Sequence, residues 1–211
     1  MRVFALLVAA LALAACNVIA PPSAMIPRWT TAWREAATPA DEKRLREWRT
    51  AFVGALGAAR RSGHSAEIVR EGPLLDPDAA LGGAPIPNGA FRCRVIKLGA
   101  RSPGMLDYVA YPPFTCIIQP ERGLQRFTKT SGSQRLVGLI FPGDAMRQVL
   151  LGTLVLGDES QAMQYGQDKT RDVAGYVERI GPNRWRLVMP RPHFESQLDV
   201  MELVPSSKEA R

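Results

Sequence analysis

The stretch Phe91-Arg92-Cys93-Arg94-Val95 decides the fold, because its odd-numbered residues are apolar and its even-numbered residues are charged. An alternation with a period of two is typical of a strand that buries one face. The stretch Phe114-Thr115-Cys116-Ile117-Ile118 shows the same alternation, with apolar residues at the even positions. Both segments are therefore predicted strands, and Cys93 and Cys116 are expected on their inward faces.

Further short runs of β-forming residues continue to Val204, separated by turn signals such as Pro142-Gly143-Asp144 and Gly181-Pro182-Asn183. Connections this short cannot join parallel strands, so the pattern predicts an antiparallel meander. About eight strands can close into a barrel, which is either filled by side chains or holds one small ligand. The predicted strands are Phe91–Leu98, Phe114–Gln119, Leu124–Lys129, Leu136–Phe141, Arg147–Leu156, Val173–Ile180, Trp185–Met189 and Leu198–Val204.

A helix is predicted before the strands. Thr38 suits the N-cap, Pro39 the first helical position, and Gly63 the end of the helix. Apolar residues recur between them at three- and four-residue steps, which buries one helical face. The predicted fold class is α+β, with an N-terminal helix or helical hairpin followed by an antiparallel β-meander of about eight strands that forms a lipocalin-like or calycin-like barrel.

The N-terminus reads as an export signal. Arg2 precedes an uninterrupted apolar run from Val3 to Ala15, and the ending Leu13-Ala14-Ala15-Cys16 resembles the lipobox of bacterial lipoproteins. In such proteins the cysteine becomes the acylated first residue, so Cys16 is the predicted lipidation site. The alternative is an ordinary signal peptide cleaved nearby, with Cys16 as an unmodified thiol.

This interpretation divides the chain into four parts. Residues 1–15 are the expected signal peptide, residues 16–37 the lipid anchor and tether, residues 38–205 a single globular domain, and residues 206–211 a disordered tail. Within the domain, 38–72 are expected to be helical and 90–205 to form the barrel. Trp29 and Trp33 interrupt the tether, and we expect them to pack on the domain rather than to lie at the lipid interface.

The expected location is the bacterial cell envelope, with the protein held by a lipid anchor and facing the periplasm. Asn17 stands where an Asp would favour the inner membrane in some bacteria, which favours the outer membrane. The formal net charge of +7 at pH 7 is spread along the chain, without a clustered basic arm, so nucleic acid is not an expected partner. Anionic lipid head groups or cell-wall polymers are the acidic partners available in the envelope, but solvated arginines on strand faces are the favoured explanation of the charge.

Cys93 and Cys116 are the two cysteines that remain once Cys16 carries lipid. In an oxidising compartment such a pair forms a disulfide, which here would close a loop of about 24 residues and stabilise the fold by about 3 kcal/mol. Two buried, reduced thiols are the alternative.

Motifs for catalysis, metals and cofactors are missing. The sequence contains no Gly-x-Ser-x-Gly, no Cys-x-x-Cys and no His-x-x-x-His, and its two histidines are His64 and His193. No metal and no cofactor is therefore expected, and an enzyme is less favoured than a binding protein.

One loop combines three functional side chains, namely Arg191, His193 and Glu195 between the last two predicted strands. At alternate positions they could converge on an anionic or sugar ligand. A solvated loop in which Arg191 and Glu195 pair weakly is the alternative. Weaker binding candidates of the same kind are Arg135, Tyr165 and Asp168.

Several segments together resemble a known family. They include Gly132-Ser133-Gln134-Arg135, Arg92 to Gly99 with the later Cys116, Tyr165-Gly166, Glu178 to Leu187 and Pro190 to Pro205. The chain resembles, from about Ala40 to Pro205, an uncharacterised family of exported bacterial proteins, domain of unknown function 4893. That family has no established activity, so the resemblance implies export and assigns no catalytic residue.

The sequence thus favours a cell-envelope lipoprotein without enzymatic activity, which binds a small apolar or amphiphilic ligand or another envelope component. The alternatives are an envelope hydrolase that uses His193 with Glu195, and an inhibitor or assembly factor acting through protein contacts.

Overall fold

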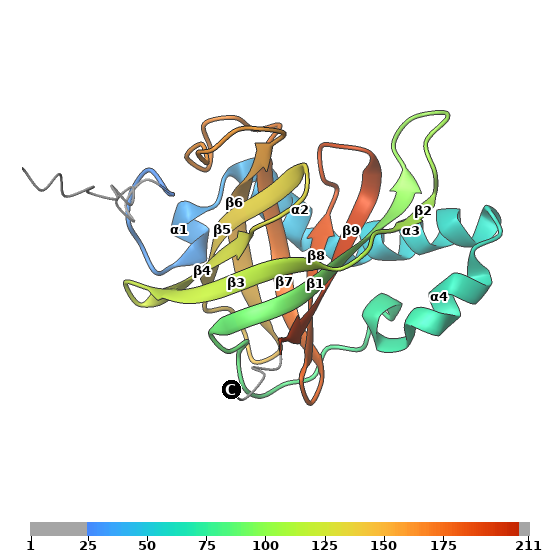
Figure 1. Ribbon diagram of the computed structural model, residues 1–211, viewed down its shortest axis with the longest axis horizontal. Helices are drawn as coiled ribbons and strands as arrows, with labels where there is room; N and C mark the ends of the chain where they lie inside the picture. The colour runs from blue at the N-terminus through green and yellow to red at the C-terminus, as the bar shows by residue number, and fades with distance from the viewer. Residues whose placement is uncertain (1–24, 207–211) are drawn as a thin grey trace, which may run out of the picture.

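The computed structural model describes residues 25–206, and in it helices precede a β-barrel (Figure 1). The signal peptide, the predicted lipidation site Cys16 and residues 207–211 of the predicted tail lie outside the described residues. No helix in the described part is long and apolar enough to cross a membrane.

The strands form a closed antiparallel barrel. Neighbours in sequence are neighbours in the sheet, and the first strand pairs with the last from Phe91↔Pro205 to Ala100↔Ser196. This closure confirms the predicted meander and the barrel of eight strands. The ninth strand, β2, was not predicted, and it pairs with the end of β1 next to the barrel. The bounds are β1 Gly89–Ala100, β2 Tyr108–Ala110, β3 Phe114–Glu121, β4 Leu124–Lys129, β5 Gln134–Phe141, β6 Arg147–Leu156, β7 Asp172–Gly181, β8 Arg184–Pro190 and β9 Ser196–Pro205.

Apolar side chains fill the middle of the barrel. Inward-facing residues from its strands form one buried cluster that includes Phe127, Ile140, Leu150 and Leu187. The disulfide between Cys93 and Cys116 lies in this cluster and joins β1 to β3, as the matching alternation predicted. The interior is therefore a packed core, and room for a ligand must be sought at the ends of the barrel.

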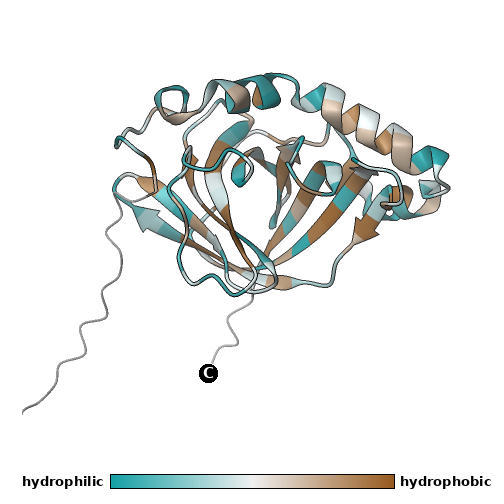
Figure 2. Cartoon of the chain, turned by 90° about the horizontal axis from the view of Figure 1, so that it is seen from above, coloured by the Kyte–Doolittle hydropathy of each residue, from teal (hydrophilic) through white to brown (hydrophobic). Residues whose placement is uncertain are grey.

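Helices cover the outer face of strands β1, β8 and β9 (Figures 1 and 2). Thr38 caps the first long helix as predicted, because its hydroxyl accepts a hydrogen bond from the Asp41 N–H. The helical region is interrupted at Glu47, whose ψ of 9° ends one helix before the next begins. The helices are α1 Trp33–Ala36, α2 Pro39–Arg46, α3 Trp48–Arg61, α4 Ser65–Glu71 and the 3₁₀ helix η2 Gly72–Leu75.

Residues 25–37, which the sequence assigned to the tether, lie against the barrel. Met25 and Ile26 are buried, and Trp29 and Trp33 pack against the same cluster as Phe141. Apolar side chains in this segment hold it on the barrel, so any free tether lies before Met25.

Candidate ligand-binding cavity

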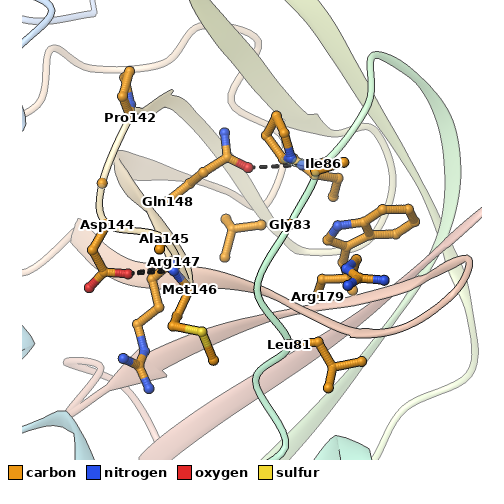
Figure 3. A pocket seen from close by; sticks show the side chains of 15 residues that line it. Leu81, Gly83, Ile86, Pro142, Asp144, Ala145, Met146, Arg147, Gln148 and Arg179 are labelled. Carbon is orange, nitrogen blue, oxygen red and sulfur yellow. Dashed lines mark hydrogen bonds between the residues drawn. The ribbon is translucent and has the colours of Figure 1, made fainter.

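A cavity of about 300 Å³ lies at the end of the barrel where β5 and β7 end and β6 and β8 begin (Figure 3). The segment that precedes β1 passes this end of the barrel. We call this cavity the barrel-end cavity. Three parts of the chain line it. They are the segment 81–86 before β1, the turn 142–148 between β5 and β6, and the inward-facing residues Val177, Arg179 and Trp185 of β7 and β8.

The segment Leu81–Ile86, which we call the strap, is held at both ends. The Ile86 N–H donates to Gln148 Oε1 at 2.9 Å, and the Ile86 carbonyl accepts from Gln125 Nε2 at 2.9 Å. At the other end, the Leu81 N–H donates to the carbonyl of Arg179 at 2.8 Å. The residues between these two anchors pass over the cavity (Figure 3).

The turn between β5 and β6 forms the opposite wall. One carboxylate oxygen of Asp144 accepts from the N–H groups of Met146 and Arg147, each at 2.8 Å. Such a contact is typical of an aspartate that stabilises a turn. The Arg147 side chain points out of the cavity, because it pairs with Glu178 at 2.6 Å and stacks over the ring of Trp48.

Trp185 and Arg179 give the cavity unsatisfied hydrogen-bond donors. The Trp185 side chain is 6% exposed, and its indole N–H has no hydrogen-bond partner in the described part of the chain. The guanidinium of Arg179 donates to the carbonyl of Gly82, while its Nε–H is buried and has no partner among residues 25–206. Buried donors without a partner cost about 1–3 kcal/mol each, so these two groups mark a place where a ligand oxygen would be stabilised.

The opposite end of the barrel carries a buried charged cluster and a smaller hollow of about 110 Å³. The Lys97 ammonium lies 2.9 Å from Asp199 and 3.2 Å from Glu195. Burial raises the pKa of Asp199. Burial opposes the charge of Lys97, but the two carboxylates outweigh it and raise the pKa of Lys97.

Lys129 also lies at this end, without a carboxylate partner among the described residues. Its ammonium donates to the carbonyls of Ser131 and Gln134, at 2.7 and 2.9 Å, and lies over the ring of Phe114. Burial, with the nearby charges of Arg135 and Lys97, lowers the pKa of Lys129 to about 8.

The three predicted side chains of the loop between β8 and β9 do not converge. Glu195 reaches Lys97, whereas His193 lines a neighbouring hollow with Arg44. No hydrogen bond joins His193 to Glu195 within residues 25–206. Burial and the charges of nearby arginines lower the pKa of His193. Arg191 lies 3.4 Å from Glu47 of the helical layer, so the three side chains reach different parts of the structure.

The weaker candidates have structural partners. Arg135 donates to the carbonyl of Glu159. Tyr165 is buried, accepts from the Thr38 N–H at 3.0 Å, donates to Asp41, and has a raised pKa because of burial. Asp168 accepts from the N–H and hydroxyl of Thr170, at 2.9 and 2.7 Å. None of these three side chains lines the barrel-end cavity.

Sequence reasoning did not identify Arg179 and Trp185 as site residues. The alternation gave a usable signal for Arg179, because a residue two positions after the inward-facing Val177 faces inward as well. An arginine there interrupts an otherwise apolar face. The part of the chain that the structure describes holds no group of three or more His, Cys, Asp or Glu side chains that could bind a metal.

The fold and the site define a small, closed antiparallel barrel of the calycin-like kind, with a packed interior and a cavity at one end. The chain belongs to the family described as domain of unknown function (DUF4893), whose profile matches residues 33–203. This match confirms the family expected from the sequence segments. Among curated proteins and among solved structures, no relative matches this chain.

Proposed function

We propose that this protein is a binding module of the bacterial cell envelope, without enzymatic activity, that holds a small amphiphilic ligand in the barrel-end cavity. The observation that carries the proposal is the cavity itself. Its volume of about 300 Å³ lies at the lower end of the range for small-molecule sites, and its walls combine apolar side chains with a few polar groups. Leu81, Ile86 and Val177 supply apolar wall, and Arg179 and Trp185 supply donors.

A lipid anchor at Cys16 is the second part of the proposal, supported by the sequence Leu13-Ala14-Ala15-Cys16. Cys16 and Met25, where the chain packs on the barrel, are nine residue steps apart along the chain. A segment of that length spans at most about 30 Å when fully extended. An anchored barrel would thus stay close to the membrane surface, where amphiphiles are concentrated.

Native mass spectrometry of the full-length protein, extracted in detergent from its own membrane, tests both parts. We expect a bound small molecule, and a protein mass that begins at a lipid-modified Cys16. An unmodified N-terminus at another residue would contradict the anchor without affecting the cavity.

A variant that fills the cavity separates specific binding from adventitious binding. Ala145 lies in the exposed turn that lines the cavity, so Ala145→Trp is expected to abolish the bound mass while leaving the fold intact. Ala40→Trp, at an exposed position of α2 outside the cavity, is the matched control. Equal ligand loads in the wild-type protein and both variants would contradict binding at this site, and no bound mass in any of them would contradict the function.

A further inference from the structure

Arg179 is partly buried and, unlike Arg186 and Arg94, has no carboxylate partner among residues 25–206. Arg186 pairs with Glu178 at 2.7 Å, and Arg94 pairs with Glu202 at 3.1 Å. No carboxylate within ion-pair distance of Arg179 occurs in the described part of the chain. A shielded guanidinium without a counter-charge is costly, because the protein removes water from it and gives back only hydrogen bonds to neutral groups.

Other charges near the cavity do not compensate Arg179. The charge of Arg147 is already balanced by Glu178. Among the described residues that line the cavity, Asp144 is the one acidic residue, and one of its carboxylate oxygens accepts hydrogen bonds from two backbone N–H groups of its own turn. Figure 3 shows Asp144 and Arg179 on opposite walls. The cavity is therefore electropositive on the wall formed by Arg179.

Trp185 adds a second donor to the same cavity. Its indole N–H can only donate, and it has no partner within residues 25–206 although the side chain is almost completely buried. A neutral acceptor would satisfy the indole N–H but not the charge of Arg179. A carboxylate satisfies both, because it presents two oxygens and a full negative charge.

We propose that the ligand of the barrel-end cavity is a small amphiphilic carboxylic acid, bound through its carboxylate to Arg179 and the indole N–H of Trp185. Its apolar part lies against Leu81, Ile86 and Val177 of the strap and β7. This assignment rests on the proposed binding function and names the chemical class of its ligand. The strap passes directly over the acid, so the guanidinium contact with Gly82 also connects the ligand to the strap.

Two probes of the same shape test the charge requirement, namely 2-naphthoate and the neutral 2-naphthamide, titrated calorimetrically into the full-length protein. We expect 2-naphthoate to bind about tenfold to a hundredfold more tightly than the amide, the range of a charge-assisted hydrogen bond. Arg179→Gln should remove that preference, and Arg179→Lys should retain part of it. Arg92→Gln, which removes an exposed arginine outside the cavity, should change neither affinity.

The indole N–H provides a readout that a loss of folding would not imitate. In a ¹H–¹⁵N spectrum, the indole signal that disappears in the Trp185→Phe variant belongs to Trp185. Addition of 2-naphthoate to the wild-type protein is expected to shift this signal downfield. The indole signals of Trp29, Trp33 and Trp48 are expected to stay in place. If all other signals in the spectrum of the Arg179→Gln variant are unchanged, the fold of that variant is intact.

The outcomes separate the ligand class from the function. Equal affinities for the two probes, with the Trp185 signal shifted by both, would overturn the carboxylate assignment and leave the binding function standing. Failure of both probes to bind or to shift the Trp185 signal at millimolar concentration, in a protein that carries no bound mass from its membrane, would overturn both.

Discussion

Arg186 shows how this protein accommodates a completely buried charge. Its guanidinium pairs with Glu178 at 2.7 Å and also donates to the carbonyls of Pro73 and Leu74, each at 3.0 Å. Those carbonyls belong to η2, where helical hydrogen bonds run out. One side chain therefore satisfies backbone groups at the end of the helical layer and connects that layer to strand β8.

The buried position of Arg186 predicts a large effect of its removal. Arg186→Ala leaves Glu178 with Arg147 alone and leaves the η2 carbonyls unpaired, so we expect a loss of about 3–5 kcal/mol in the free energy of unfolding. Arg184→Ala, in the same strand, breaks a partly exposed pair with Glu202 and should cost about 1 kcal/mol or less. Urea unfolding of both variants measures the difference, and equal losses would contradict the role given to burial.

Lys129 predicts a rise in stability between pH 8 and pH 10.5. Its pKa is about 8 in the folded protein and 10.5 as the ordinary value, so in this window the unfolded chain holds more protons than the folded one. Stability then increases with pH, because neutral Lys129 is buried at lower cost than charged Lys129. Unfolding free energies at pH 7.5 and pH 10 should show the wild type gaining stability relative to Lys129→Met. Parallel pH profiles of the two proteins would contradict the lowered pKa.

At the scale of the elements, alternation predicted the strands because each of them buries one face. The match extends to the disulfide, since Cys93 and Cys116 occupy inward positions on paired strands. Local sequence patterns were less informative at positions where tertiary contacts determine the backbone conformation. The helical stripe continues through Glu47, yet the chain turns there so that α3 follows the barrel surface. The short strand β2 exists only because the end of β1 offers it an edge.

The cavity could not be predicted from the sequence because no local pattern contains it. Ile86 lies in a segment rich in Pro and Gly that reads as an ordinary loop, and it becomes the end of the strap only through Gln125 and Gln148 from two distant strands. Conversely, Arg191, His193 and Glu195 are close in sequence, but the left-handed backbone at Arg191 (φ 49°) and Glu195 (φ 67°) accompanies side chains that reach different partners.

Two facing glycines allow β5 and β6 to approach closely, which gives a prediction for the barrel wall. Gly138 pairs with Gly152, and a Cβ atom on Gly152 would collide with the backbone of Val137 and Gly138. Gly152→Ala should therefore destabilise the fold by about 1–3 kcal/mol. Gly54→Ala is the control, because an added Cβ meets nothing in the exposed middle of α3 and should stabilise the helix by about 0.5–1 kcal/mol. Thermal unfolding should show shifts of opposite sign, and a stabilised Gly152→Ala would contradict the close approach.

For the molecule as a whole, the disulfide restricts the unfolded chain. The bond between Cys93 and Cys116 spans a sequence separation of 23 residues, so its loss is expected to cost about 3 kcal/mol. Labelling of the unfolded, unreduced protein with a thiol reagent should leave both cysteines unmodified. The double variant Cys93→Ala, Cys116→Ala and the reduced wild type should unfold at the same lower urea concentration. Labelling of Cys93 and Cys116 without reduction would contradict the bond.

The pairing of β1 with β9 has a consequence for the order of events during folding. Strand β1 leaves the ribosome about 100 residues before the strand that must bind its free edge. Until Ser196–Pro205 arrives, the sheet is an open ribbon with two unprotected edges, and closing it requires the slow meeting of distant segments. Strand β9 is therefore the strand that closes the barrel. The barrel can close only after Ser196–Pro205 has been released.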